Sequence, residues 1–243
     1  MVALPGSRRG VLGFGVVTLV MLVFLVGLGI WQLQRKAQKH ALIVALTERL
    51  AAAPVPLAPP QDWPALTPEH DEFRRVTLVA LPDARPHAFV FTSGSPLRPD
   101  VTGLGVWELA PLRTASGQTV VVNLGFVPDG QSAPERPDAG PVTLTGYLRF
   151  PEPPTAFTPL PDLTKRTWYG RDSASMAQLL DWGEVAPFYV DLESPVPAGG
   201  WPKPGPLQVE LRDLHLQYAI TWFALAAALV AAFGFWVRGR HRA

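Results

Sequence analysis

Cysteine is missing altogether from the 243 residues of this sequence. A chain without thiols forms no disulfide, no cysteine-ligated zinc or iron–sulfur centre and no cysteine nucleophile. Methionine is scarce too, with three residues, so the soft sulfur ligands typical of copper chaperones are nearly missing. The five histidines are too far apart in the sequence to predict a metal cluster: His40, His70, His87, His215 and His241.

An excess of charge of either sign is also missing, because 21 basic and 20 acidic residues give a formal net charge of +1. A protein that binds nucleic acid neutralises phosphates with a concentrated excess of lysine and arginine. Nucleic acid is therefore not predicted as a partner.

Long apolar runs are present, in contrast, near both ends of the chain. Residues 11–31 and 216–237 carry no charged side chain, and each reaches the ~20 residues that cross a bilayer core. The first run is longer than the apolar part of a signal peptide and continues into "WQLQRK" without a small-residue cleavage site. The two runs predict a pair of retained membrane helices.

The positive charges around these runs predict their orientation. Basic residues that flank the outer ends favour a cytoplasmic position for both termini: Arg8, Arg9, Arg238, Arg240 and Arg242. Three basic residues after the first run oppose this assignment, but a long loop crosses a membrane largely regardless of its charge: Arg35, Lys36 and Lys39. Only ten residues precede the first run, which leaves no room for an arginine-rich mitochondrial presequence, so a bacterial inner membrane is expected.

Between the apolar runs, short segments rich in β-branched and aromatic residues alternate with Gly, Pro, Asp and Ser clusters, as antiparallel strands and turns do. The predicted strands are 73–81, 87–93, 104–112, 118–127, 141–150 and 186–193, with a hairpin turn at 114–118. One further helix is expected over 172–182, with Asp172 or Ser173 as N-cap and Met176, Leu179 and Leu180 on one face.

The predicted fold class is a membrane α-helical hairpin of two transmembrane helices plus a β-rich α+β extracytoplasmic domain. Prolines between 54 and 68 favour an extended, semi-rigid connector before that domain. The predicted parts are a cytoplasmic N-terminus (1–10), transmembrane helix 1 (11–31), a helical extension (32–53), a proline-rich connector (54–72), the β-rich domain (73–213), transmembrane helix 2 (214–237) and a cytoplasmic tail (238–243).

The expected domain shows no local trace of a hydrolase or a phosphate-binding loop. The stretch "EHDE" at 69–72 combines His70 with carboxylates, and His87 begins a predicted strand. Positions in a proline-rich connector and at a strand start favour solvated surface residues over acid–base or metal sites. A membrane-anchored periplasmic enzyme or sensor stays an alternative, which a cleft gathering both histidines would favour.

The outer end of the second membrane helix offers a different chemistry. At about 100° per residue, one face carries His215, Tyr218, Ala219, Trp222, Ala226, Leu229 and Phe233. One face of the first helix carries Phe24, Gly27, Leu28, Trp31 and Arg35. The small residues suggest a groove between the helices, where imidazole could ligate iron and Arg35 could pair with carboxylates. Taken alone, these residues favour the alternative of an ordinary interfacial aromatic belt.

Three segments resemble the surfeit locus protein 1 family, assembly factors for haem–copper cytochrome oxidase. They are "LHLQYAITWFALA" at 214–226, "LGIWQLQRKAQK" at 28–39 and "VVVNLGFVP" at 120–128, with weaker matches in "FRRVTL", "YLRFPEPP" and "WYGRDSASMA". The sequence departs from the family pattern at Leu124 and Phe126, where an arginine and a tryptophan are usual, and it lacks the asparagine that commonly precedes the histidine of the second helix.

The resemblance implies an inner-membrane protein that is not an enzyme and helps to install haem a in the oxidase catalytic subunit. It implies that His215 ligates the haem iron, that Tyr218 and Trp222 accompany it, and that Trp31, Gln32 and Arg35 belong to the first-helix motif. Expected partners are the catalytic subunit, the lipid bilayer and an enzyme of haem a biosynthesis. The alternative within this family is a scaffold that stabilises an oxidase intermediate without binding haem.

Overall fold

The computed structural model describes residues 8–131, 140–209 and 214–241, which form two compact units. The first, the helical unit, joins the chain up to Val44 with the chain from residue 214. The second, the sheet domain, comprises the described residues from Ala45 to 209.

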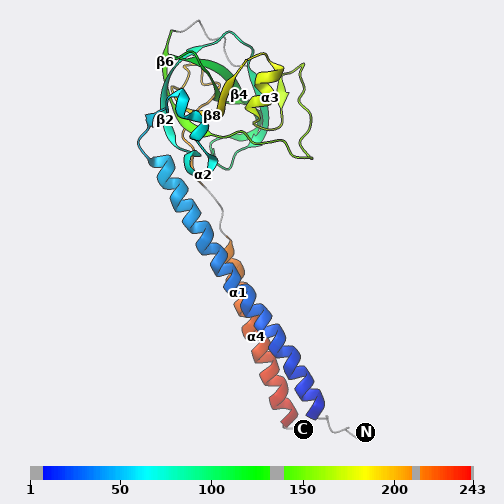
Figure 1. The fold of residues 1–243 in the computed structure, drawn as a ribbon. Helices are drawn as coiled ribbons and strands as arrows, with labels where there is room; N and C mark the ends of the chain where they lie inside the picture. Colours follow the sequence, from blue (N-terminus) through cyan, green and yellow to red (C-terminus); the bar gives the residue numbers. More distant parts are fainter. Residues whose placement is uncertain (1–7, 132–139, 210–213, 242–243) are drawn as a thin grey trace. The chain divides into compact units, whose positions relative to one another are not determined.

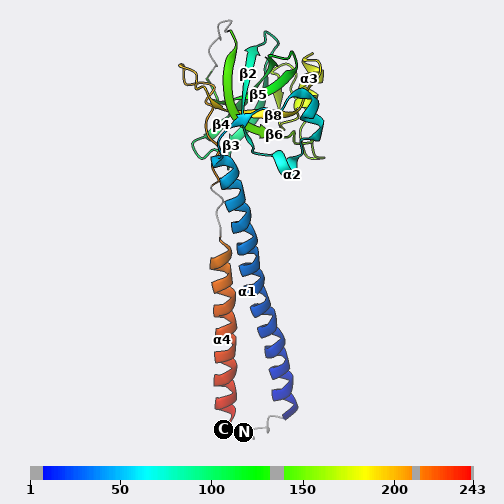
Figure 2. The same ribbon diagram turned by 60° about the vertical axis from the view of Figure 1, so that its left-hand side comes forward.

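The helical unit consists of most of α1 (Arg8–Ala51) and all of α4 (His215–His241). The two helices lie side by side and antiparallel in both views (Figures 1 and 2). Near the first turns of α1, the ring of Phe14 lies 4.7 Å from the ring of Trp236, close to the end of α4. Both helices are long and apolar enough to cross a membrane. At 44 residues α1 is about 66 Å long, so it exceeds a bilayer core as the expected helical extension requires.

The sheet domain contains eight strands in the order β1-β2-β6-β8-β5-β4-β3-β7. They are β1 (Val55–Pro56), β2 (Arg75–Pro82), β3 (Ala88–Gly94), β4 (Thr102–Thr114), β5 (Thr119–Pro128), β6 (Val142–Arg149), β7 (Thr167–Trp168) and β8 (Val185–Ser194). An additional pairing between β2 and β4 closes β2, β6, β8, β5 and β4 into a ring, and Figure 2 shows these strands curling round one another.

The pairing corrects the expectation of an antiparallel sheet, because β1–β2, β3–β7 and β5–β8 are parallel. Parallel neighbours need a long crossover connection. Here the chain between β5 and β8 passes through β6, β7 and the helix α3 (Ser173–Leu179). The hairpin between β4 and β5 is as predicted, with Arg113 opposite Thr119 and Gly117 at φ +88° in the turn.

Alternate residues of the strands enter two separate apolar cores. On β8, Phe188 and Val190 belong to the core enclosed by the ring of strands, whereas Tyr189 belongs to a second core that also contains Met176 of α3. The alternation is that of strands covered on both faces. At β8 the outer face of the ring is therefore buried, whereas on β2 the outward-facing Val79 is exposed.

The proline-rich stretch 54–72 is part of the domain and not the extended spacer that its prolines suggested. It contains β1, a 3₁₀ helix η1 (Pro60–Ala65) and a short helix α2 (Pro68–Asp71). Trp63 is buried in the ring-enclosed core with its ring 5.3 Å from that of Phe188, and its Nε1 donates to the carbonyl of Ala58. Aromatic burial outweighs the preference of proline-rich sequence for extended chain.

Helix α3 begins where the sequence predicted, with Asp172 as its N-cap and Met176 buried, although Leu179 is exposed. We expect Asp172→Ala to destabilise the protein by about 1 kcal/mol, because the carboxylate accepts a hydrogen bond from the backbone N–H of Ser175 at 3.1 Å. Thermal unfolding should show the midpoint falling by about 2–4 °C. Asp172→Asn keeps the acceptor and should unfold near the wild-type midpoint; equal midpoints for the alanine variant and the wild type would contradict the capping role.

Candidate functional site

His215 is the first residue of α4, and its imidazole meets α1 at Gln32. The distance between His215 Nδ1 and Gln32 Oε1 is 2.7 Å, and both side chains are partly buried. When Nδ1 carries the proton, it donates to the amide oxygen and the ring is held in one orientation. Metal-ligating histidines are oriented in this way, with one ring nitrogen donating to an oxygen acceptor.

Below His215 the two helices pack closely. Ala219 is 1% exposed and Ala226 is also buried, while a Cβ built on Gly29 would lie 2.6 Å from the ring of Phe223. Small residues here let the helices approach one another. This corrects the expectation of an open groove between the helices. The small residues bring the two helices into close contact and leave no groove between them.

The packing also corrects the face of α1 that was expected to meet the second helix. Leu25, Gly29 and Gln32 lie in the interface, whereas Phe24 and Gly27 are exposed. The first helix is apolar on every side, so its sequence contains no polar stripe to show which face is inward.

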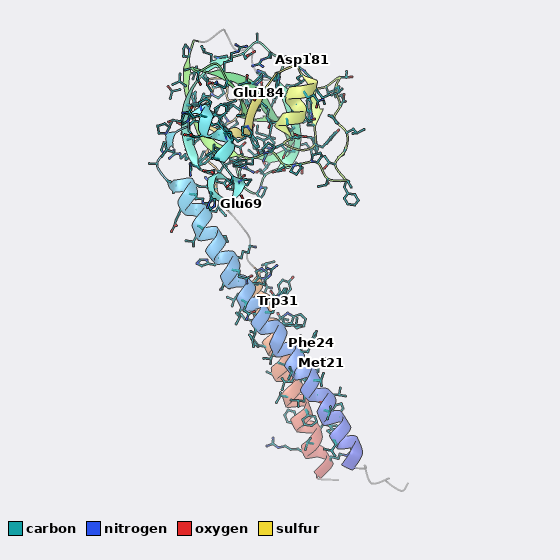
Figure 3. The ribbon with its side chains drawn as sticks, in the orientation of Figure 1. Met21, Phe24, Trp31, Glu69, Asp181 and Glu184 are labelled. Carbon is teal, nitrogen blue, oxygen red and sulfur yellow. The ribbon has the colours of Figure 1, made fainter. Side chains whose placement is uncertain are left out.

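Trp31 and Arg35 lie outside the interface, near Gln32. Trp31 is 48% exposed; Figure 3 labels it with Met21 and Phe24 along α1. The guanidinium of Arg35 lies 5.9 Å from the Trp31 ring centroid, and its Nη1 reaches Gln38 at 3.5 Å. An exposed guanidinium over an indole leaves most of its donors available to a carboxylate.

On α4, Tyr218 is 52% exposed and so lies beside the interface rather than in it. Trp222 is partly buried, and its indole Nε1 is buried without a hydrogen-bond partner among the described residues. A buried donor of this kind needs an acceptor. The edge of the helical unit therefore offers an oriented imidazole, an arginine, exposed aromatic rings and an orphan indole donor.

These residues fit an amphipathic metal ligand only in part. No group of three His, Asp or Glu side chains gathers around a common point within the described residues, so a metal here would depend on the single imidazole of His215. Arg35, Trp31 and Tyr218 are exposed on the surface of the helix pair. The closed interface at Ala219 and Gly29 does not accommodate a planar ring between the helices.

A second concentration of polar side chains lies on the outer face of the strand ring. Arg149 of β6 donates from Nη1 to Asp191 Oδ2 at 2.9 Å and from Nε to Glu72 Oε1 at 2.5 Å. Asn123 of β5 donates to the other oxygen of Asp191 at 2.7 Å. Arg149, Asn123 and Asp191 are all buried. We call these four residues the Arg149 network. The sequence did not predict that they come together, although polar and charged residues within otherwise apolar strands indicated that such residues have buried partners.

The segment 120–128 is built into this network. The amide oxygen of Asn123 accepts from the backbone N–H of Gly125, which has φ +129° and faces the backbone of Lys203. A Cβ at Gly125 would lie within 2.3 Å of the Lys203 backbone, so glycine is required there. The departures at Leu124 and Phe126 fall on buried core residues, and Phe126 packs edge-on against Trp107 at 5.7 Å.

Two arginines flank the buried ring of Trp107 beside this network. The guanidinium carbons of Arg98 and Arg171 lie 5.9 Å and 5.4 Å from its centroid. Hydrogen bonds from Arg98 hold the pKa of Asp100 well below its usual range, and burial raises the pKa of the Tyr189 hydroxyl. The cavity between these residues measures only about 10 Å³, which suits one water molecule and not an organic ligand.

The two histidines of the sheet domain do not form a shared cleft. His87 Nδ1 lies 2.6 Å from Oε1 of the buried Glu108, while His70 is exposed on α2. Neither lines the domain's cavities of about 330 Å³ and 190 Å³. His87 is thus paired with a single carboxylate at the start of β3, and the cleft that would favour an enzyme is not formed by these residues.

Comparison with known proteins finds a family and relatives that match nearly the whole chain. Residues 19–227 match the SURF1 family. The chain is 32% identical to a SURF1-like protein of Monosiga brevicollis, an alignment that covers 96% of this chain and 90% of the relative. It is 34% identical to surfeit locus protein 1 of Homo sapiens (87% of this chain, 73% of the relative) and 33% identical to a SURF1-like protein of Drosophila melanogaster (83% and 70%).

Proposed function

The chain belongs to the SURF1 family, and from this membership we propose that it is a membrane-anchored assembly factor that binds haem a and aids its insertion into the catalytic subunit of cytochrome c oxidase. The family implies a role in oxidase assembly and is not a family of enzymes. Haem a would thus be cargo that the protein passes on and not a resident cofactor.

The observation that supports haem binding is the contact between His215 and Gln32 at 2.7 Å. We assign the iron to the imidazole of His215, with Gln32 orienting the ring. Arg35 would pair with the propionate carboxylates, and Trp31, Tyr218 and Trp222 would contact the porphyrin. A single imidazole ligand would suit cargo that must be released.

We propose that the two helices span the membrane with both termini in the cytoplasm and the sheet domain on the opposite side. The antiparallel pairing of α1 and α4 supports a common side for the termini, and the flanking arginines favour the cytoplasm. The membrane that we propose is a bacterial inner membrane, whereas the relatives named above are eukaryotic.

A scaffold function without haem is the second candidate. The closed packing at Ala219 and Gly29 favours it, because the interface itself holds no space for a ligand. In that case the sheet domain would carry the activity, and changes at Asn123–Pro128 would impair assembly while changes at His215 would not.

Deletion of the gene tests the proposed function. We expect membranes of the deletion strain to lose most of the haem a absorbance and oxidase activity, and plasmid-borne wild-type protein to restore both. A second terminal oxidase without haem a serves as the internal control and should be unaffected. Normal haem a oxidase in the deletion strain would overturn the function itself.

A further inference from the structure

The loop that joins β6 to β7 exposes two large apolar side chains almost completely. In this loop, residues 150–166, Phe157 is 94% exposed and Leu160 is 89% exposed; Leu163 is half-exposed. Single exposed apolar residues are common on protein surfaces, but neighbours exposed to this extent mark an interaction site.

The loop holds these side chains in a defined arrangement. Five of its residues are proline: Pro151, Pro153, Pro154, Pro159 and Pro161. A turn beside Phe157 is closed by the N–H of Thr158, which donates to the carbonyl of Thr155 at 3.0 Å, and by the N–H of Thr155, which donates to Oγ1 of Thr158 at 2.9 Å. The loop is thus preorganised, and binding through it costs little conformational entropy.

Exposed aromatic residues of the sheet edge continue the apolar surface. The methyl group of Thr158 lies 3.9 Å from the position of a Cβ on Gly170, so the turn packs beside the chain that follows β7. The neighbouring Tyr169 is half-exposed and its ring lies 6.1 Å from that of the equally exposed Phe91 on β3. We call Phe157, Leu160, Tyr169 and Phe91 the apolar edge.

The charges of the loop decide between a membrane and a protein as the occupant. A loop that binds anionic lipid carries lysine or arginine beside its apolar residues. Residues 153–161 carry no charge, and the charged residue on either side of them is acidic, Glu152 and Asp162. The loop's basic residues, Lys165 and Arg166, come after Asp162 at its β7 end. Phe157 and Leu160 lie instead in a segment without charge between two acidic residues, which matches the apolar centre of a protein interface.

We propose that the apolar edge is the docking surface for the oxidase catalytic subunit, with Phe157 and Leu160 inserted into an apolar groove of that subunit. This inference rests on the proposed function and names its contact surface. The apolar edge belongs to the sheet domain, whereas His215 belongs to the helical unit.

The double variant Phe157→Asp/Leu160→Asp tests the proposal in cells that lack the wild-type gene. We expect affinity-tagged full-length variant to co-purify with at least about tenfold less catalytic subunit than the wild type does. Both side chains are exposed, so the variant should accumulate and unfold like the wild type. Val196→Asp places one aspartate on an exposed valine of another proline-rich stretch and should leave the yield of catalytic subunit unchanged.

A labelled variant separates the possible occupants. Because the chain has no cysteine, Ala156→Cys takes a single environment-sensitive fluorophore beside Phe157 in the full-length protein. In vesicles of phosphatidylethanolamine and phosphatidylglycerol the emission should stay that of an aqueous label, and it should shift to the blue when the catalytic subunit is added. A blue shift in lipid alone, or one that depends only on the concentration of the labelled protein, would overturn the proposal in favour of the bilayer or of a second copy.

Failure of this inference differs from failure of the proposed function. If deletion abolishes the oxidase and the double aspartate variant restores it fully with normal co-purification, only the docking surface is wrong. If deletion leaves the oxidase intact, the function on which the inference rests is wrong.

Discussion

Replacement of His215 by alanine is expected to remove haem from the purified protein and to leave its fold intact. The imidazole is the group to which we assign the iron, and alanine supplies no atom that binds iron. The side chain is only partly buried at the first residue of α4, so its loss should cost little stability. With haem a biosynthesis intact, we expect at least a tenfold fall in haem per protein, measured from the visible spectrum of detergent-purified protein.

His40→Ala is the matched control, because His40 is an exposed histidine of α1 outside the interface with α4. Its haem content should equal that of the wild type. Gln32→Ala keeps the imidazole but removes its 2.7 Å contact, so we expect haem affinity to fall by about 10–100-fold and the purified protein to retain more haem than His215→Ala does. Equal haem content in the wild type and His215→Ala would remove His215 from the mechanism and favour the scaffold.

The sequence predicts where the two helices of the helical unit lie in the chain, but it does not predict which face of α1 packs on α4. Hydropathy locates α1 and α4 because a bilayer-spanning helix must be apolar along ~20 residues. The face of α1 that packs on α4 depends instead on size and shape, as the contact of Gly29 with Phe223 shows. Residues such as Trp31 and Gly29 are both compatible with an apolar stretch, so periodicity alone did not separate the exposed one from the buried one.

In the sheet domain, local pattern predicts the strands but not their partners. The six long strands lie within about two residues of the predicted segments, while the two-residue strands β1 and β7 were missed. Parallel pairing of β5 with β8 joins Val121 to Tyr189 across the intervening chain, a long-range contact that no local pattern encodes. Trp63 was missed for the same reason, since its core partner Phe188 lies far away in the sequence.

In the candidate site, too, the sequence indicated individual residues but not the contacts between them. His215 was identified because a histidine at the head of an apolar helix is visible in the sequence, and the resemblance to a family gave it a role. Its partner Gln32 was part of the matched motif without an assigned contact. The Arg149 network went unseen because its members lie on three strands and a loop that only the fold brings together.

Removal of Arg149 is expected to destabilise the sheet domain severely. Arg149→Ala leaves Asp191 buried without its cation and frees Glu72, and breaking a buried pair of this kind costs about 3–5 kcal/mol. For a unit of this size we expect the unfolding midpoint to fall by about 6–20 °C, measured by tryptophan fluorescence of the detergent-purified protein. Arg113→Ala, which removes an exposed arginine whose Nε lies 3.4 Å from Asp83, should change the midpoint by no more than about 2–4 °C.

The pattern of losses distinguishes this network from a binding site. If Arg149 acts through the fold, Arg149→Lys should recover part of the midpoint because a cation returns beside Asp191, and the recovery should be incomplete because lysine does not span both carboxylates as the guanidinium does. Haem content per folded molecule should stay normal in either variant, whereas His215→Ala should lose haem at an unchanged midpoint. An Arg149→Ala protein of wild-type stability that no longer supports the oxidase would instead place Arg149 in a functional contact, since a buried charge that costs nothing to unpair is not holding the fold.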